Sequence, residues 1–350
     1  MPSREGRSAL AAACASLTFK RQPIWTGLLT NRFCAAFRHL GLHRSGDIMA
    51  EPVTICICTY RRPSLFETLA SIEQLRLRNV DVVGVLVVDN DLADGLRSEV
   101  AERAGSYRFP LRYCHAPAQN ISIARNAALD GVETRWAAFI DDDEVASPDW
   151  LEELYAAAEG AEAVIGQSVA QYGPALPGWA ARCDFHSNRI TGRVDNAYTS
   201  NALLDVDFLR RKNIRFREEL GRTGGEDTLL FRQLAESGGR IVYRPESVVY
   251  EEVPPTRASM TWVFRRMYRA GQTHGLLSRE YDAKAFSRLG LTAGAKALAS
   301  AAMTLATLPG TDASRRWAAR SALHLGALSY RVRPTILEEY GVAAVGEPRK

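Results

Sequence analysis

The sequence feature that most constrains the fold is an apolar run that ends in four consecutive carboxylates. Residues 136–140 read Trp-Ala-Ala-Phe-Ile, and Asp141, Asp142, Asp143 and Glu144 follow directly. A short continuous apolar run bounded by polar residues is typical of a strand that is buried on both faces. The chain is therefore expected to deliver four acidic side chains to one edge of a buried sheet.

The spacing of these acids predicts a metal site. Side chains alternate across a strand, so Asp141 and Asp143 should share one face while Asp142 points away. Two carboxylates held together repel each other unless a cation lies between them. Mg²⁺ or Mn²⁺ accepts such oxygen ligands and leaves positions open for substrate phosphates. The alternative is a solvated acidic loop in front of a helix that begins at Ser147 and Pro148.

Two further apolar runs predict neighbouring strands. Residues 53–58 and 82–88 contain only apolar residues, one Thr and one Gly, and are followed by Thr59 and Asp89. A helical pattern separates the two runs, and another precedes the run that ends in the acids. This alternation predicts an α/β fold with a Rossmann-like, mostly parallel sheet flanked by helices. Ligands of such sheets bind beyond the C-terminal ends of the strands, where Thr59, Asp89 and the acids fall.

Two side chains at this edge suit a nucleotide. Asp89 can accept a hydrogen bond from the N–H of a base, although a simple turn aspartate is the alternative. Arg125 lies in the first turn of a predicted helix, where it can pair with a phosphate beside the helix N-terminus. A surface ion pair is the alternative for Arg125.

A second acidic centre follows two glycines. Gly224 and Gly225 allow a sharp turn and leave open space in front of Glu226 and Asp227, although acids are also favoured at any helix start. Adjacent side chains on a helix diverge by about 100°, so only one of the pair can face a substrate. We expect that one to be Asp227, acting as a general base, because it lies near the edge of the buried face of its helix. In this half we also predict strands at 163–169, 200–204, 240–245 and 247–250.

Charge is distributed unevenly along the chain. The formal net charge is +4, but residues 1–48 carry +5, residues 254–350 carry +9, and the middle of the chain carries −10. A nucleic-acid-binding protein normally has its basic patch on the folded domain, so we expect no nucleic-acid partner. A basic C-terminal region instead suits an anionic membrane surface.

The C-terminal region predicts helices that associate with a membrane without crossing it. Residues 260–269 form a basic amphipathic pattern, and residues 291–308 are apolar, rich in Ala and Thr, and interrupted by Lys296. The uncharged part, 297–308, is too short to span a bilayer, which favours an interfacial hairpin. A plain helical cap on the catalytic domain is the alternative.

Four segments are expected. Residues 1–48 partly mimic a signal peptide but lack its cleavage site, so we interpret them as a weakly ordered extension before a natural start at Met49. Residues 49–255 form the predicted catalytic domain, 256–340 the helical basic and apolar segment, and 341–350 a tail.

An ordered set of motifs resembles the family 2 glycosyltransferases. The set comprises Thr59-Tyr60-Arg61-Arg62, Asp89-Asn90, residues 120–126, Asp141-Asp142-Asp143-Glu144 and Gly225-Glu226-Asp227. More narrowly, residues 199–204, 224–228 and 265–275 resemble the succinoglycan-type exopolysaccharide β-1,4-glucosyltransferases. The resemblance runs from about Val53 to Tyr340.

This resemblance implies a GT-A fold, a UDP-sugar donor, a divalent metal and inversion at the anomeric carbon. For the nucleotide, it implies that Asp89 binds uracil and that Thr59 and Arg62 line the pocket, with Arg125 nearby. It implies that Asp141 contacts the ribose or the metal-bound diphosphate and that Asp143 ligates the metal. The implied base is Asp227. Asp142, Glu226 and Arg266 complete the predicted substrate-binding and nucleotide-binding set. Where relatives often place a histidine, this chain has Tyr250-Glu251-Glu252. Either a carboxylate substitutes for the histidine there, or the metal site has one protein ligand fewer.

The expected function is transfer of one sugar, glucose, from a UDP-sugar to a lipid-linked oligosaccharide in exopolysaccharide biosynthesis. The enzyme is expected to be peripheral, on the cytoplasmic face of the inner membrane. A sugar nucleotidyltransferase would need a Gly-rich basic loop after the first strand, where this chain has Thr-Tyr-Arg-Arg-Pro. An inactive nucleotide-sugar-binding scaffold would be favoured by loss of Asp143 or Asp227, and both are present.

Overall fold

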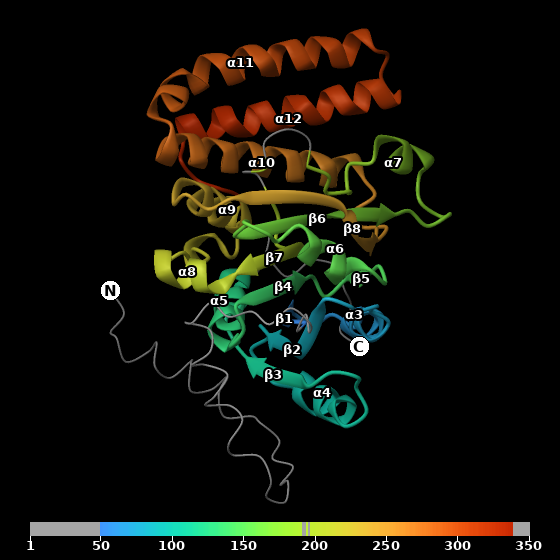
Figure 1. Ribbon diagram of the computed structural model, residues 1–350. Helices are drawn as coiled ribbons and strands as arrows, with labels where there is room; N and C mark the ends of the chain where they lie inside the picture. The colour runs from blue at the N-terminus through green and yellow to red at the C-terminus, as the bar shows by residue number, and fades with distance from the viewer. Residues whose placement is uncertain (1–49, 191–193, 195–196, 339–350) are drawn as a thin grey trace, which may run out of the picture.

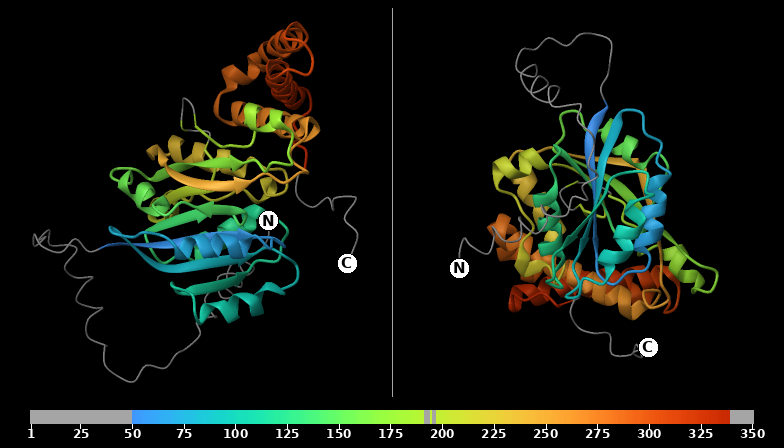
Figure 2. Two further views of the ribbon diagram at one scale, coloured as in Figure 1. Left: turned by 90° about the vertical axis from the view of Figure 1, so that its right-hand side faces the viewer. Right: turned by 90° about the horizontal axis from the view of Figure 1, so that it is seen from below.

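The computed structural model describes residues 50–190, 194 and 197–338 (Figure 1). The predicted N-terminal extension and the tail lie outside these residues. The described part contains one eight-stranded sheet with the order β3-β2-β1-β4-β7-β6-β8-β5. Helices cover both of its faces, as the view along the sheet in Figure 2 shows.

The first half of the sheet is parallel, as the sequence predicts. Strands β1 (Glu51–Thr59), β2 (Val80–Asp89), β3 (Leu111–His115) and β4 (Trp136–Ile140) all run in one direction. Their C-terminal ends therefore meet at one edge. Thr59, Asp89 and the acids after Ile140 lie at this edge, which confirms their predicted placement on the sheet.

The second half of the sheet is mixed. Strand β7 (Asn201–Asp205) runs antiparallel between β4 and β6 (Ala163–Gln171), and β5 (Glu144–Ala146) runs antiparallel beside β8 (Ile241–Glu252). The sequence predicts two short strands where the single strand β8 is found.

A bulge explains how β8 continues through a proline. The pairing of β8 with β6 shifts register between Ile165 and Gln167, and Pro245 lies in the skipped part of β8. The Gln167 side-chain amide donates to the Pro245 carbonyl oxygen at 2.6 Å. A proline removes one ladder hydrogen bond, and a bulge is a place in a strand where that loss is tolerated.

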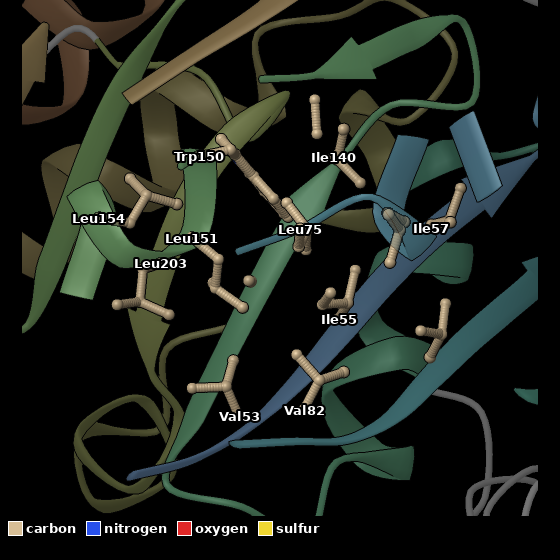
Figure 3. Packing of buried hydrophobic residues seen from close by; sticks show 14 of the residues in the cluster. Val53, Ile55, Ile57, Leu75, Val82, Ile140, Trp150, Leu151, Leu154 and Leu203 are labelled. Atoms are coloured by element: carbon tan, nitrogen blue, oxygen red, sulfur yellow. The ribbon is translucent and has the colours of Figure 1, made fainter. Parts of the chain in front are cut away.

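Alternate residues of β1 supply the two cores of the sheet. Val53, Ile55 and Ile57 pack with the helices of one face, and Figure 3 shows them beside Trp150 and Leu203. Cys56 and Cys58 point into the other core. Burying such residues contributes roughly 1.5–3 kcal/mol per large side chain, which fixes the register of the strands.

The helices divide between these two faces. On the Val53 side lie α3 (Leu65–Glu73), α4 (Leu96–Ala104) and α6 (Trp150–Ala156). On the Cys56 side lie α5 (Ile121–Gly131), α8 (Val206–Lys212) and α9 (Glu226–Glu236), while the short helix α7 spans Gly178–Cys183.

Helix α6 begins later than the sequence predicts. Ser147 and Pro148 are the predicted start, but the first helical residue is Trp150, with Asp149 in the cap position. The Trp150 amide closes a turn by donating to the Ser147 carbonyl oxygen at 2.9 Å. The Asp149 carboxylate pairs with Arg76 instead of capping the helix. The turn and the burial of Trp150 therefore set the start of α6.

Three long helices pack on one another next to the second half of the sheet: α10 (Met260–Tyr281), α11 (Ala283–Ala306) and α12 (Asp312–Val332). Helix α10 lies nearest the sheet in Figure 1, with α12 and then α11 beyond it. Helix α10 extends beyond the predicted 260–269 because its glycines are packing sites. A β-carbon at Gly271 would lie 1.9 Å from the Leu323 carbonyl oxygen, and one at Gly326 would lie 1.9 Å from the Tyr268 carbonyl oxygen. Glycine thus lets the backbones of α10 and α12 come into contact.

Helix α11 is the one helix of the described residues that is long and apolar enough to cross a membrane. The sequence expectation considers only its uncharged part, whereas the helix itself has 24 residues. Only 22% of its most apolar window is buried. Leu291, Leu298 and Leu305 are 82%, 75% and 72% exposed. Their seven-residue spacing places these leucines on one face of α11.

Candidate active site

A cleft of about 1120 Å³ opens at the C-terminal ends of the parallel strands and runs toward α10, α11 and α12. Nine of the ten predicted site residues line it: Thr59, Arg62, Arg125, Asp141, Asp142, Asp143, Glu226, Asp227 and Arg266. The cleft therefore joins the end of β4 to the start of α9, two segments that lie far apart in the sequence.

Arg125 links the two acidic centres. Its side chain on α5 is 7% exposed, and its Nη1 donates to Glu226 Oε1 at 2.7 Å and to Asp227 Oδ1 at 2.6 Å. Its Nη2 reaches Asp141 Oδ1 at 3.4 Å. Burial acts to lower the pKa of Arg125, but the three carboxylates outweigh it and raise that pKa. The guanidinium therefore stays charged and holds the acids in one network.

Asp227 has a second donor that fixes its orientation. The Thr199 hydroxyl donates to Asp227 Oδ1 at 2.6 Å, and the Thr199 amide contacts Asp227 Oδ2 at 3.4 Å. Oδ1 thus accepts from two strong donors, whereas Oδ2 has only this long contact within the described part of the chain. The carboxylate is 15% exposed, toward the cleft.

Glu226 lies deeper than Asp227. Its side chain is 7% exposed, and its Oε2 has no hydrogen-bond partner in the described part of the chain. Burial and the neighbouring charge of Asp227 raise the pKa of Glu226 to about 7. Glu226 and Asp227 are therefore chemically different carboxylates despite their adjacency.

Two arginines meet the acids at the other side. Arg62 Nη1 lies 3.0 Å from Asp143 Oδ2, and Arg257 Nη2 lies 3.7 Å from the same oxygen. Arg257 also pairs with Glu251. Arg257 has no sequence motif, whereas Glu251 lies where the family resemblance suggests a substitute carboxylate.

The carboxylates around Asp143 raise the pKa of one another. Burial followed by the charge of Asp143 raises the pKa of Asp142 to about 7 and raises that of Glu251. Burial is also the largest cause of the raised pKa of Asp141 and Glu144. Burial and neighbouring carboxylates thus both disfavour the charged forms, and a bound cation would favour them.

The donor set fits a metal that also binds a substrate. Among the described residues, no three His, Cys, Asp or Glu side chains converge on one point. Asp141 and Asp143 would thus hold a cation with the help of oxygens from elsewhere. Mg²⁺ is commonly bound in this way, through one or two carboxylates together with phosphates.

Comparison with known proteins gives the family. A model described as Glycosyl transferase family 2 matches residues 54–215. The succinoglycan biosynthesis protein ExoM of Rhizobium meliloti (strain 1021) is 39% identical over 300 residues, which cover 84% of this chain and 97% of the relative. The chain belongs to the family 2 glycosyltransferases. Its class of activity is glycosyl transfer.

Two further similarities are more distant. The glucosyl-dolichyl phosphate glucuronosyltransferase of Haloferax volcanii is 24% identical over 253 residues, which cover 65% of this chain and 78% of the relative. The mannosyltransferase PcManGT of Pyrobaculum calidifontis, solved with GDP-Man and Mn²⁺, matches with a TM-score of 0.58 and 21% identity. That match covers 87% of this chain and 94% of the solved one, which confirms the GT-A fold.

The glycosyltransferase holds Asp89 below the cleft surface. Asp89 is 1% exposed; its Oδ2 accepts from the Tyr113 hydroxyl at 2.8 Å and its Oδ1 from the Asp91 amide at 3.0 Å. Asp89 is the one predicted residue that does not line the cleft, whereas its neighbour Asn90 does. Its predicted contact with uracil remains a prediction.

At the other end of the site, Arg266 is held by neighbours from two segments. Its Nη2 donates to Asn188 Oδ1 at 3.0 Å, and its guanidinium lies 5.2 Å from the ring centroid of Trp262. Trp262 in turn stacks on His186 at 4.8 Å. Arg266 is therefore fixed in the wall of the cleft of this glycosyltransferase.

Proposed function

We propose that the enzyme transfers glucose from a UDP-sugar to a lipid-linked oligosaccharide, with inversion, in exopolysaccharide biosynthesis. Family membership and the name of the Rhizobium relative support this assignment. The observation that carries it is Arg125, which holds Asp141 and Asp227 in one cleft. A donor-binding acid and a base for the acceptor are thereby kept within reach of one sugar.

On the donor side, Thr59, Arg62 and Asp142 line the nucleotide pocket and Asp89 binds uracil. Asp141 and Asp143 hold Mg²⁺ or Mn²⁺, with Asp141 also touching the ribose or the diphosphate. When bound, the cation neutralises charge that builds up on the UDP leaving group. Arg62 and Arg125 add fixed positive charge beside the diphosphate, in a site where little reorganisation is needed.

On the acceptor side, Asp227 removes the proton from the attacking hydroxyl. Asp227 lines the cleft, its Oδ1 is held by Arg125 and Thr199, and its Oδ2 has only the long contact from the Thr199 amide among the described residues. The hydroxyl attacks the anomeric carbon from the face opposite UDP, which gives inversion. Glu226 and Arg266 orient the acceptor and the donor sugar.

The enzyme docks peripherally on the cytoplasmic face of the inner membrane through α11. Its exposed leucine face and the nearby Arg288 suit an anionic interface. High salt or carbonate should strip the protein from membranes, and resistance to both would indicate a spanning helix instead.

A panel of UDP-sugars assayed with Mn²⁺ and Mg²⁺ tests the chemistry. We expect UDP-glucose to be consumed and its sugar to appear on a lipid-linked acceptor with the anomeric configuration inverted. Product stereochemistry is read by NMR, and Asp227→Asn serves as the inactive control. Consumption of a GDP-sugar in place of every UDP-sugar would overturn the donor assignment.

A further inference from the structure

The cleft has a basic end that the proposed reaction does not use. Beyond the acids it runs between the three C-terminal helices, where His274, Lys296 and His324 line it. Each comes from a different helix: α10, α11 and α12. His274 and Lys296 are exposed and His324 is half-buried, so all three can meet a ligand.

Close helix crossings hold these side chains together. Gly271 of α10 contacts the backbone at Leu323 of α12, and His274 and His324 lie within one turn of that crossing. Helix α11 joins at the same level, because the Ser321 hydroxyl donates to the Ala297 carbonyl oxygen at 3.3 Å, next to Lys296. The pKa of both histidines is lowered, first by burial and then by the charge of Lys296.

No counter-charge balances this group. In the described part of the chain, none of the three side chains forms an ion pair or a hydrogen bond with an acidic residue. Asp282, an acid of the same lining, caps α11 by accepting from the Ala285 amide at 2.8 Å. Arg62, Arg125 and Arg257 at the other end of the cleft, by contrast, all pair with carboxylates.

We propose that His274, Lys296 and His324 bind a diphosphate, the group that would join the acceptor oligosaccharide to its lipid. An ammonium and two imidazoles offer donors from three directions, which suits the several oxygens of a diphosphate better than one carboxylate. The chemistry of the site stands on these residues, whereas its assignment to the acceptor rests on the proposed function. A nucleotide diphosphate is the other source of the same group.

The position on α11 favours the lipid-linked source. At about 100° per residue, Lys296 and the Leu291, Leu298 and Leu305 face lie on nearly opposite sides of α11. One helix thickness, about 10–12 Å, therefore separates the basic group from the exposed apolar surface. A lipid whose diphosphate sits at Lys296 needs to pass only this helix to reach the interface.

Calorimetry on the full chain in EDTA tests the site without the metal centre. We expect inorganic pyrophosphate and a short prenyl diphosphate to bind, and the corresponding prenyl alcohol not to bind. Lys296→Gln should weaken diphosphate binding by about tenfold or more, as for loss of a charged hydrogen-bond partner. Lys284→Gln, an exposed lysine on the same helix but outside the cleft, is the matched control and should have no effect.

The outcomes separate this inference from the proposed reaction. Equal affinities in Lys296→Gln and Lys284→Gln would overturn the site, and His324→Asn gives a second, independent variant. If UDP in EDTA displaces the prenyl diphosphate completely, and Lys296→Gln weakens the binding of UDP as much as that of the prenyl diphosphate, the acceptor assignment is overturned. In transfer assays Lys296→Gln should raise the KM for a diphosphate-linked acceptor and leave the KM for the UDP-sugar unchanged. If the wild-type protein binds prenyl diphosphate but transfers no sugar, the proposed reaction is refuted and the diphosphate site is not.

Discussion

The two ends of the cleft differ in whether their cationic side chains are paired with carboxylates. At the strand ends, Arg62, Arg125 and Arg257 all contact carboxylates, and acids still outnumber cations. Between the helices, Lys296 and two histidines have no acidic partner among the residues that the structure describes. A ligand at the first end must exchange existing partners, whereas a ligand at the second end supplies the missing charge. We infer that the acidic end at the strand ends is organised before the substrate binds, whereas the basic end between the helices gains its counter-charge from the ligand.

Loss of the proposed base, Asp227, should give the largest effect. Asp227→Asn keeps the size of the side chain and can still accept from Arg125 and Thr199, but it cannot take a proton. We expect transfer to fall by roughly 10²–10⁴-fold while UDP binding stays nearly intact. Steady-state transfer and calorimetry with UDP and Mn²⁺ measure the two quantities.

Glu226→Gln is the matched variant for Asp227→Asn. Glu226 is more deeply buried and its pKa is raised to about 7, so we expect a smaller loss in the chemical step. Near wild-type turnover in Asp227→Asn together with abolished turnover in Glu226→Gln would reverse the two roles.

Removal of Arg125 should break the organised end of the cleft. Arg125→Leu leaves Asp141, Glu226 and Asp227 together without their shared cation, and breaking a buried ion pair costs about 3–5 kcal/mol. The raised pKa of Glu226 should then rise further, so the loss should be largest at pH 8 and shrink as acidification neutralises the acids. Denaturant unfolding at pH 8 and pH 5.5 measures this trend.

Arg215 provides the control for that experiment. Arg215 also lies beside α5, but its ion pair with Asp130 is 42% and 40% exposed. Arg215→Leu should change the free energy of unfolding by at most about 1 kcal/mol. An equal loss in both variants would mean that Arg125 is not special to the site.

The proposed metal site can be tested separately from the arginines that surround it. Asp143→Ala removes one predicted ligand and frees Arg62 and Arg257 to approach the diphosphate directly. We expect the gain in UDP affinity on adding Mn²⁺ to shrink by about tenfold or more, since even indirect partners of a metal contribute on that scale. Asp149→Ala, at an exposed ion pair on α6, should retain the full gain. Equal gains in the two variants would remove Asp143 from the site.

Local patterns predict the parallel half of the sheet well because its strands are buried on both faces. The apolar runs of β1, β2 and β4 are therefore continuous and end sharply at polar residues. The pattern fails where tertiary contacts decide. Pro245 lies inside β8 at a bulge, and Gly271 lies inside α10 because another backbone packs on it. From the local sequence alone, Pro245 predicts the end of a strand and Gly271 predicts the end of a helix.

The residues of the candidate site also divide into those that local motifs predict and those that only tertiary contacts bring together. Motifs identify the acids and Asp227, but Arg125 contacts residues that are 101 and 102 positions away, and no local pattern encodes that network. Thr199, Arg257 and the basic residues of the C-terminal helices were missed as site residues for the same reason. The available signals were weak: Thr199 lies in a segment that resembles relatives, and Lys296 is the one charged residue of the segment 291–308.

The smallest expected effect tests whether the basic end is one cluster. Lys296→Gln should raise the pKa of both His274 and His324, because the lysine charge disfavours protonation of each ring. A lowered pKa in the folded state means that stability is lost as pH falls, so this variant should lose less stability on acidification than the wild type. Near neutral pH the change in the free energy of unfolding should stay within about 0.5 kcal/mol, as for most surface substitutions.

NMR titration of the ring signals of His274 and His324 measures both pKa values, with Lys284→Gln as control. Pyrophosphate should likewise raise them in the wild type, whereas values unmoved by the substitution would place Lys296 too far away to act with the histidines.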